Sequence, residues 1–454
     1  MRVGVCSGGV HYRGNVAIIR AACRTPSMGR RAKQPNRQLA ELFEETGASR
    51  KGLARRAVER GKAIGVDLGL EFSLSLAEAT AAAIALWRSD VERRRFLMDA
   101  SYAVAVYPAA SMRWLTMPGP EHPVSSGYRR IGQDDVDAVR TMTTAFRNLD
   151  NQVGGGKVRP TIVHYLHSSV APLLHGSYNE SIGRQLFAAT PELTKLAGWA
   201  AYDLEERGLA QRYFIQALRM ARAASDAGLA GEILAAMSHQ ATYVGRSGDA
   251  IDLACAARIA ARTAGLAALE SECHLLERTD TPPAPPGRRA CGRADTTCPA
   301  WLAYFDDAYM SAKTAHCFRD LGDYTQAAEF AEQSLNMSDG YLWGRTFNLC
   351  LPASSRADED PREAVRIGFE ALDLAVGLES RRSFSYLRQI RHRLAPYSEM
   401  GDVAEFRRRV FAITARADRA LGIGRPLLLR RRSHRGRSCR LRRGSESIEC
   451  PRLH

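Results

Sequence analysis

Residues 321–335 read LGDYTQAAEFAEQSL, and their spacing predicts one unit of a helical repeat. Small residues recur at Ala327, Ala331 and Ser334, at positions where two packed helices must approach closely, and Gly322 stands at the preceding turn. Such a pattern is typical of the second helix in a helix–turn–helix repeat unit. The stretch therefore predicts an all-α solenoid.

The same pattern recurs along the chain. Each copy carries two small or apolar residues seven positions apart, and the further pairs are Ala210 with Ala217, Ala250 with Ala257, Ala364 with Ala371, and more weakly Ala404 with Phe411. The first members of successive pairs, with Ala327 included, lie 40, 77, 37 and 40 residues apart. These periods are longer than the usual tetratricopeptide repeat of about 34 residues. We expect a tetratricopeptide-like α-solenoid over residues 133–424.

The 77-residue interval spans about two periods, so one unit is missing near residue 288. Prolines stand there at positions 282, 283, 285 and 286. Proline lacks the backbone donor that a helix needs and clashes with the preceding turn. Residues 279–298 are therefore expected to interrupt the array, either as a loop that leaves it or as a damaged part of the gene.

Positive charge is concentrated at the two ends of the chain. The 454 residues carry a formal net charge of +15, but residues 1–38 contribute +8 and residues 425–454 another +8. The body, residues 39–424, is therefore at −1 and does not indicate a nucleic-acid partner by its overall charge. We expect residues 1–27 to be a disordered extension. Residues 425–454 are expected to be an Arg-rich disordered tail, with non-specific nucleic-acid binding as the alternative.

Nothing in the sequence predicts a membrane span or an export signal. No run of about 18 apolar residues occurs, and Arg13, Arg20 and Arg24 interrupt the apolar stretch near the N-terminus. The ten cysteines are widely spaced, as in proteins with reduced thiols. The sequence favours a cytoplasmic protein.

Residues 38–61, QLAELFEETGASRKGLARRAVERG, have the pattern of the first two helices of a helix-turn-helix domain. The exposed side is basic, with Arg50, Lys51, Arg55 and Arg56 placed to meet DNA phosphates. An ordinary helical hairpin with a solvated basic face is the alternative. We assign residues 28–66 to a partial helix-turn-helix domain.

No recognition helix follows these two helices. Residues 66–69, VDLG, lead almost directly to Phe72 and to a strong helix over residues 74–98. Base reading needs an element in the major groove, because phosphate contacts carry no sequence information. Residues 101–132, which contain Pro118, Pro120 and Pro123, are expected to be a connector. Together, residues 70–132 form the predicted connecting helix and linker.

In this order, these segments resemble a known family. The helix-turn-helix start, LWRSDVERRRFL, FRNLDNQVGGGKVRPTIVHYL, LAGWAAYDLEERGLAQRYFIQAL and EILAAMSHQATYVG are similar to segments of actinobacterial transcriptional regulators. Those regulators join a DNA-binding domain to tetratricopeptide-like repeats, and some are negative regulators of sporulation and antibiotic production. The resemblance implies that residues 49–60 lie across the DNA backbone, while the family's base-reading helix has no matching residues here.

We expect neither an enzyme nor a cofactor. No nucleophile elbow of the G-x-S-x-G type occurs. The triplet Gly154–Gly156 suggests a phosphate loop, but Asn151 replaces its first glycine and Val158 its Ser or Thr, so we interpret it as an inter-helix turn. Cys291 and Cys298 are seven apart, whereas paired zinc ligands are about two to four apart. No metal site is expected.

The sequence thus predicts a transcriptional regulator whose repeats bind a peptide or protein in a groove formed by the first helices. The alternative is an interaction scaffold without specific DNA binding. Aromatic residues on or near those helices are the candidate groove residues, with inter-repeat core as the alternative for each. They are Trp199, Tyr202, Tyr243, Trp301, Tyr304 and Phe305. The expected partners are DNA, that ligand and a second copy of the chain, and no membrane.

Overall fold

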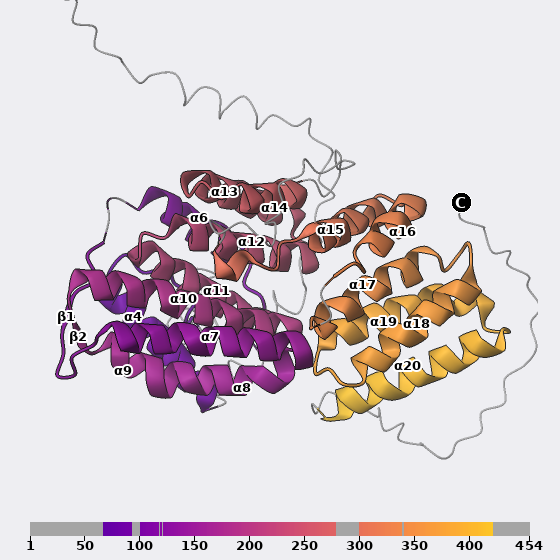
Figure 1. Cartoon of the computed structure of the whole chain (residues 1–454), viewed down its shortest axis with the longest axis horizontal. Helices are drawn as coiled ribbons and strands as arrows, with labels where there is room; N and C mark the ends of the chain where they lie inside the picture. The colour runs from indigo at the N-terminus through magenta and orange to yellow at the C-terminus, as the bar shows by residue number, and fades with distance from the viewer. Residues whose placement is uncertain are drawn as a thin grey trace, which may run out of the picture. The chain divides into compact units, whose positions relative to one another are not determined.

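Antiparallel helix pairs joined by short turns make up the fold, and they confirm the predicted all-α solenoid (Figure 1). The computed structural model describes residues 67–92, 100–117, 119, 121–277, 299–337 and 340–420. All of these belong to one unit that begins at Gly65. The partial helix-turn-helix domain, the Pro-rich interruption and the Arg-rich tail lie outside the described residues.

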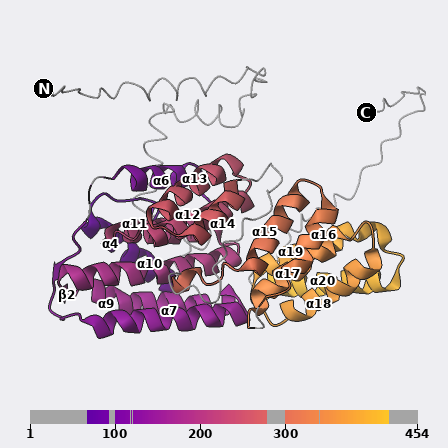
Figure 2. The same ribbon diagram turned by 45° about the horizontal axis from the view of Figure 1, so that its top comes forward.

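Six helix pairs follow one another along the chain. They are α7 (Gln133–Val153) with α8 (Gly155–Tyr165), α10 (Glu180–Asp203) with α11 (Arg207–Ala223), α12 (Ala227–Tyr243) with α13 (Ser247–Thr263), α15 (Asp307–Asp320) with α16 (Tyr324–Gln333), α17 (Leu342–Ser355) with α18 (Pro361–Ala375), and α19 (Arg381–Arg393) with α20 (Gly401–Ala420). Between α13 and α15 stands α14 (Ala267–Glu277). Figure 2 shows α12 beside α13 and α17 beside α18 from a second direction.

Both helices of each of these six pairs lie in the described part of the chain, whereas α14 has no second helix there. The remaining elements are short or lie at the N-terminal side of the array. They are α4 (Leu76–Val91), α6 (Val106–Thr116), a π-helical turn (Leu166–Val170), α9 (Ala171–Leu174), two 3-10 turns (Ala300–Leu302 and Ala395–Tyr397), and the two-residue strands β1 (Ser125–Ser126) and β2 (Ser177–Tyr178), which pair antiparallel.

The turns between the helices repeat with a constant spacing. Glu205, Ser225, Gly245 and Gly265 all have a left-handed backbone, with φ between 56° and 75°, and each lies twenty positions after the one before. In each turn the next residue's N–H donates to a carbonyl five positions back, as from Glu206 to Ala201 (2.9 Å). This is the Schellman arrangement that ends a helix. Two helices and two turns therefore make a 40-residue unit.

Small residues of the sequence pattern lie where the second helix of a pair is packed. Ala210 and Ala217 in α11, and Ala250 and Ala257 in α13, are fully buried. The same holds for the pairs in α16 and α18. The weakest predicted pair, Ala404 with Phe411, is wrong by one position: both are exposed, and Val403 and Val410 are the buried residues.

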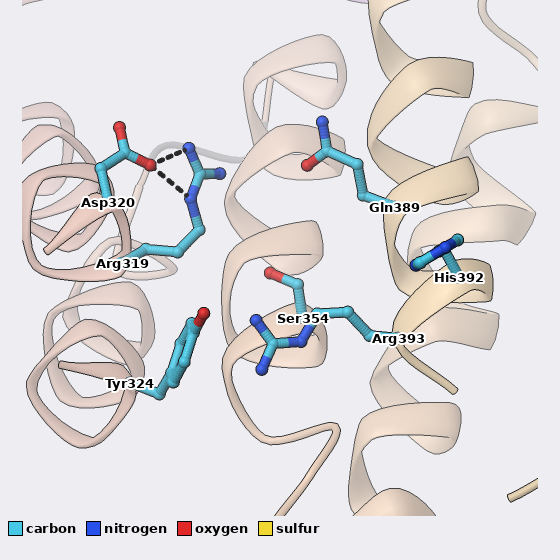
Figure 3. Close-up of a pocket in the computed structure, with 7 residues that line it drawn as sticks. All are labelled: Arg319, Asp320, Tyr324, Ser354, Gln389, His392 and Arg393. Atoms are coloured by element: carbon cyan, nitrogen blue, oxygen red, sulfur yellow. Dashed lines mark hydrogen bonds and ion pairs between the residues drawn. The ribbon is translucent and has the colours of Figure 1, made fainter. Parts of the chain in front are cut away.

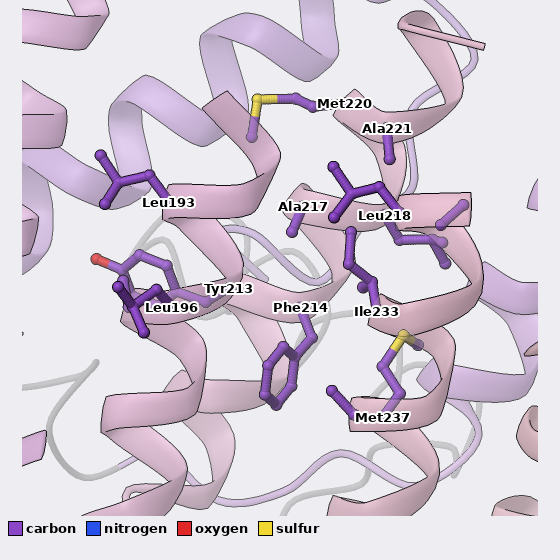
Figure 4. Close-up of a cluster of buried hydrophobic side chains, with 14 of the residues drawn as sticks. Leu193, Leu196, Tyr213, Phe214, Ala217, Leu218, Met220, Ala221, Ile233 and Met237 are labelled. Carbon is purple, nitrogen blue, oxygen red and sulfur yellow. The ribbon is translucent and has the colours of Figure 1, made fainter. Parts of the chain in front are cut away.

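The largest hydrophobic cluster extends from Phe72 to Met310, and Figure 4 shows its part between α10, α11 and α12. Leu193 and Leu196 of α10 and Phe214 of α11 belong to it, as do Ile233 and Met237 of α12. A Cβ on Gly198 would lie 2.9 Å from the Cβ of Tyr213, so the lack of a side chain allows α10 and α11 to approach closely. Small residues in the repeat thus serve helix packing.

The segment expected as a connector contains a helix, α6. Tyr107 in α6 is fully buried, and its hydroxyl donates to Gln240 in α12. The helix also packs against α11 and α13. The prolines at 118, 120 and 123 follow α6 and do not interrupt it. Composition alone pointed to a linker because the apolar face of this helix is short.

Glycines 154–156 lie where the chain contacts itself over a long sequence distance. Gly154 has φ of +82° and separates α7 from α8, as expected for an inter-helix turn. Gly156 N–H donates to the carbonyl of Glu379 (2.9 Å), and Glu379 N–H donates to that of Val153 (2.9 Å). Lys157 donates to the carbonyl of Gly377 (3.2 Å). The start of the array is thus hydrogen-bonded to the loop between α18 and α19.

Gly155→Ala is expected to lower the free energy of unfolding by about 1 to 3 kcal/mol, since the added methyl overpacks this junction. Its Cβ would lie 2.7 Å from the carbonyl oxygen of Ala200 in α10. Gly248→Ala in α13 is the control, because a Cβ there meets nothing within 4 Å. Urea unfolding of both variants measures the difference, and equal midpoints would contradict the packing argument.

No helix within the described ranges has both the length and the apolar character needed to cross a membrane.

Candidate partner-binding face

Three of the six predicted groove residues lie together. Trp199 and Tyr202 lie on α10, and Tyr243 ends α12. The ring centroids of Trp199 and Tyr202 are 5.4 Å apart, and those of Tyr202 and Tyr243 are 5.5 Å apart. Trp199 and Tyr243 are partly exposed, while Tyr202 is buried. The first helices of two successive pairs therefore present one aromatic surface.

The other three lie in the segment before α15. Trp301 packs against the largest hydrophobic cluster, and the hydroxyl of Tyr304 donates to Glu272 of α14 (2.9 Å). Phe305 is fully buried and contacts the ring of Tyr309 (5.6 Å). Phe305 is thus a core residue, as its alternative interpretation proposed, and it offers no surface to a partner.

Arg382 of α19 is placed among the aromatic rings. Its guanidinium carbon lies 4.2 Å from the ring centroid of Tyr202 and 4.9 Å from that of Phe347. Three further rings lie within 6.0 Å, those of Tyr243, Trp343 and Trp199. An arginine over aromatic faces gains about 0.5 to 2 kcal/mol from each favourable cation–π contact. The five rings belong to α10, α12 and α17.

Arg382 also has unsatisfied donors. Its Nε and Nη1 are buried and have no hydrogen-bond partner among the described residues. Asp203, a carboxylate whose charge acts on Arg382, is engaged elsewhere: Oδ1 accepts from Trp343 Nε1 (2.9 Å) and from Ser380 Oγ (2.7 Å), and Oδ2 accepts from a backbone N–H. Asp203 can balance the charge of Arg382 at a distance, but it leaves those N–H groups unpaired.

A second polar group connects α12, α14 and α15. Glu272 is buried and accepts from the hydroxyls of Tyr304 (2.9 Å) and Tyr309 (2.7 Å). Lys313 Nζ donates to Nδ1 of His239 (3.1 Å), so the proton of neutral His239 is on Nε2, which lies 3.5 Å from Glu272. Burial, with Lys313 as a second cause, lowers the pKa of His239 to about 4. His239 is therefore neutral at physiological pH.

Positive charge gathers beside this group. Burial lowers the pKa of Lys313 to about 8 against the opposing effect of Glu272, so most of the amine is charged at neutral pH. Burial also lowers the pKa of His316, and the cations Arg319, Lys313 and Arg382 lower it further. The ring of His316 packs against that of Tyr386 (5.9 Å). Burial and the neighbouring cations thus both disfavour protonation of His316.

We call the surface formed by these side chains the inner face. It comprises Trp199, Tyr202, His239, Tyr243, Tyr309, Lys313, His316, Trp343, Phe347, Arg382 and Tyr386. They belong to α10, α12, α15, α17 and α19, the first helices of their pairs. The second helices of the pairs contribute none of them.

A cavity of about 380 Å³ lies between α15, α16, α17 and α19 (Figure 3). Arg319 lines it and is held by Asp320 through Nε (3.0 Å) and Nη2 (2.8 Å). Arg393 also lines it, with its guanidinium 4.0 Å from the ring centroid of Tyr324. The remaining lining residues are Ser354, Gln389 and His392.

The predicted DNA contacts Arg50, Lys51, Arg55 and Arg56 lie outside the described residues. Sequence reasoning also missed Arg382, Lys313 and Trp343. The spacing Tyr309, Lys313, His316 on one side of a first helix was a usable signal. The position of Arg382 had none, because it depends on how α19 meets α10 across the array.

Within the described ranges, no three histidine, cysteine or acidic side chains gather as a metal site requires. Comparison with known proteins gave no relative: no protein-family model, curated protein or solved structure matches the chain.

Proposed function

We propose that this protein is a transcriptional regulator in which the helical array binds a peptide or protein partner on its inner face and thereby controls a DNA-binding N-terminal part. One observation carries the first half of this proposal. Partly exposed aromatic and charged side chains from four first helices, α10, α12, α15 and α19, converge on one face, where a solenoid commonly binds its ligands. Exposed aromatic and arginine side chains are also enriched in protein interfaces.

The DNA-binding half rests on the sequence of residues 28–66 and on the family resemblance. The basic side of the second helix would contact phosphates through Arg50, Lys51, Arg55 and Arg56. Partner binding would act on that part by favouring one arrangement of the array over another.

The second candidate is an interaction scaffold without a specific DNA target. It is favoured by the passage from Asp67 to Phe72, which leaves no residues for a base-reading helix. On this hypothesis the inner face binds the same kind of partner, and the basic residues near the N-terminus bind nucleic acid weakly or not at all.

Selection of the full chain on a random DNA library separates the two. A specific regulator is expected to enrich one sequence, and a variant with Arg50, Lys51, Arg55 and Arg56 changed to Gln is expected to lose that binding. A matched control changes four exposed arginines of the array to Gln, namely Arg140, Arg246, Arg366 and Arg408. Binding without enrichment, with affinity falling steeply between about 50 and 200 mM salt, would leave the scaffold as the function.

A further inference from the structure

We propose that Arg382 anchors a carboxylate carried by the partner of the inner face, so that the array selects acidic peptide segments. This inference rests on the proposed function, because it assigns the chemistry of the partner that the inner face binds.

The need for an acceptor is built into the site. The π faces of the rings around Arg382 attract its positive charge. They do not replace an oxygen as hydrogen-bond acceptor for its buried N–H groups. An unpaired buried donor is unfavourable, and more so on a charged group. The carboxylates nearby already accept from other donors: Asp203 from Trp343 and Ser380, and Glu205 from Tyr243 and Ser385.

The chemistry of the guanidinium selects the occupant. Its planar donor edge matches the two oxygens of a carboxylate, and it remains protonated at every physiological pH. Arg382 is partly exposed as a residue, but its Nε and Nη1 are buried, so a carboxylate reaches these two donors once the surrounding side chains move aside. The ring faces of Trp199 and Tyr386, which are both partly exposed, would pack against the apolar part of a peptide beside its acidic group.

The surroundings add positive charge on one side. Among the described residues, Lys313 has no carboxylate partner within hydrogen-bond distance and donates only to His239. His316 makes no hydrogen bond to another described residue, and Arg319, Lys313 and Arg382 are all close enough to disfavour its protonation. An anion between Lys313 and Arg382 would therefore be attracted by both, while Glu272 is held on the far side of His239 by two tyrosine hydroxyls.

A peptide library tests the inference. Each immobilised 12-residue peptide is present in two forms, one with its Asp and Glu residues and one with Asn and Gln in their place. The full chain is expected to bind acidic forms about ten-fold or more tightly than neutral forms, as the loss of one charged hydrogen-bond pair predicts. The emission of Trp199 and Trp343, both within 6.0 Å of the Arg382 guanidinium, reports the same binding in solution.

Arg382→Gln is expected to abolish the preference for acidic peptides. Arg366→Gln, at an exposed position of α18, is expected to leave that preference unchanged. Arg382→Lys keeps the charge without the planar donor edge and is expected to retain only part of the preference. Circular dichroism checks the fold of each variant. If Arg382→Gln does not fold, the acidic preference of Arg382→Lys tests the anchor role.

Four results would overturn the inference. Equal binding of acidic and neutral peptides, or an acidic preference that survives Arg382→Gln, would remove the anchor role and leave the proposed partner binding intact. Displacement of every acidic peptide by inorganic phosphate at about 1 mM would assign the site to a free anion instead. If the full chain binds no peptide in the library, the proposed function itself fails, and the carboxylate anchor fails with it.

Discussion

Asp90→Ala is expected to lower the free energy of unfolding by about 3 to 5 kcal/mol, because it leaves a buried arginine without its counter-charge. Arg159 Nη2 lies 2.8 Å from each carboxylate oxygen of Asp90, and both side chains are almost completely buried. The hydroxyl of Tyr213 donates to the same carboxylate (2.6 Å). Asp90 therefore connects α4 to α8 and α11 at one point.

Removing Asp90 affects more than one contact. Glu206, 3.4 Å from Arg159, is the remaining acid and cannot replace two short hydrogen bonds. Asp137→Ala is the matched control, since Asp137 pairs with Arg140 on the surface of α7 at 3.2 Å and such pairs contribute about 0 to 1 kcal/mol. Urea unfolding measures both variants. A cost for Asp90→Ala no larger than that for Asp137→Ala would show that the buried pair does not stabilise the array.

Asp150→Asn is expected to stabilise the protein, and to do so more strongly as the pH rises from about 5 to about 8. Asp150 is buried in α7, and its Oδ1 has no hydrogen-bond partner among the described residues. Burial and then the nearby carboxylate of Asp203 raise the pKa of Asp150 to about 8. The folded protein thus keeps this carboxyl protonated up to that pH, whereas the unfolded chain loses its proton near pH 4.

The sign of the effect follows from proton binding. Between pH 4 and pH 8 the folded state binds one proton more than the unfolded state, so stability falls as the pH rises. The slope is about 1.4 kcal/mol for each pH unit. Asparagine has the same shape and does not ionise, so it removes this slope and makes the variant more stable by several kcal/mol near pH 8.

Urea unfolding of wild type and Asp150→Asn at about pH 5, 6.5 and 8 isolates the contribution of this one group, because all other ionisable groups are common to both proteins. Asp134→Asn is the control, with the same substitution at an exposed position in the first turn of α7. A difference between wild type and Asp150→Asn that stays constant over this range would mean that Asp150 is ionised in the folded protein.

Much of the fold could be predicted from the sequence because its period is local. The need for a small residue between two helices of one pair depends on neighbours about twenty residues away. Ala210, Ala250 and Ala364 therefore recur in the sequence at a regular spacing that reveals the repeat. Helix α6 could not be predicted in this way. Its packing depends on Gln240 and on helices about a hundred residues or more further along the chain, and its own short sequence contains Pro108 and is followed by further prolines.

The inner face was predicted only in part for the same reason. Trp199, Tyr202 and Tyr243 lie on the first helices of successive pairs, which made them visible as candidates. Arg382 meets them only because α19 lies against α17 and across from α10, and no short-range pattern encodes that meeting. Phe305 shows the converse: an aromatic residue next to a first helix is as suitable for the core as for a surface, and sequence does not distinguish the two.

The hydrogen bonds between the Gly154–Gly156 turn and Glu379 have a consequence for how the protein comes apart. In an open repeat array each unit contacts only its neighbours, so the terminal units fray first and unfolding proceeds inward from either end. Here two units more than two hundred residues apart are joined by hydrogen bonds, so one of them cannot unfold without breaking its contacts with the other. Hydrogen exchange should therefore show α8 and α19 opening together, as a single cooperative element.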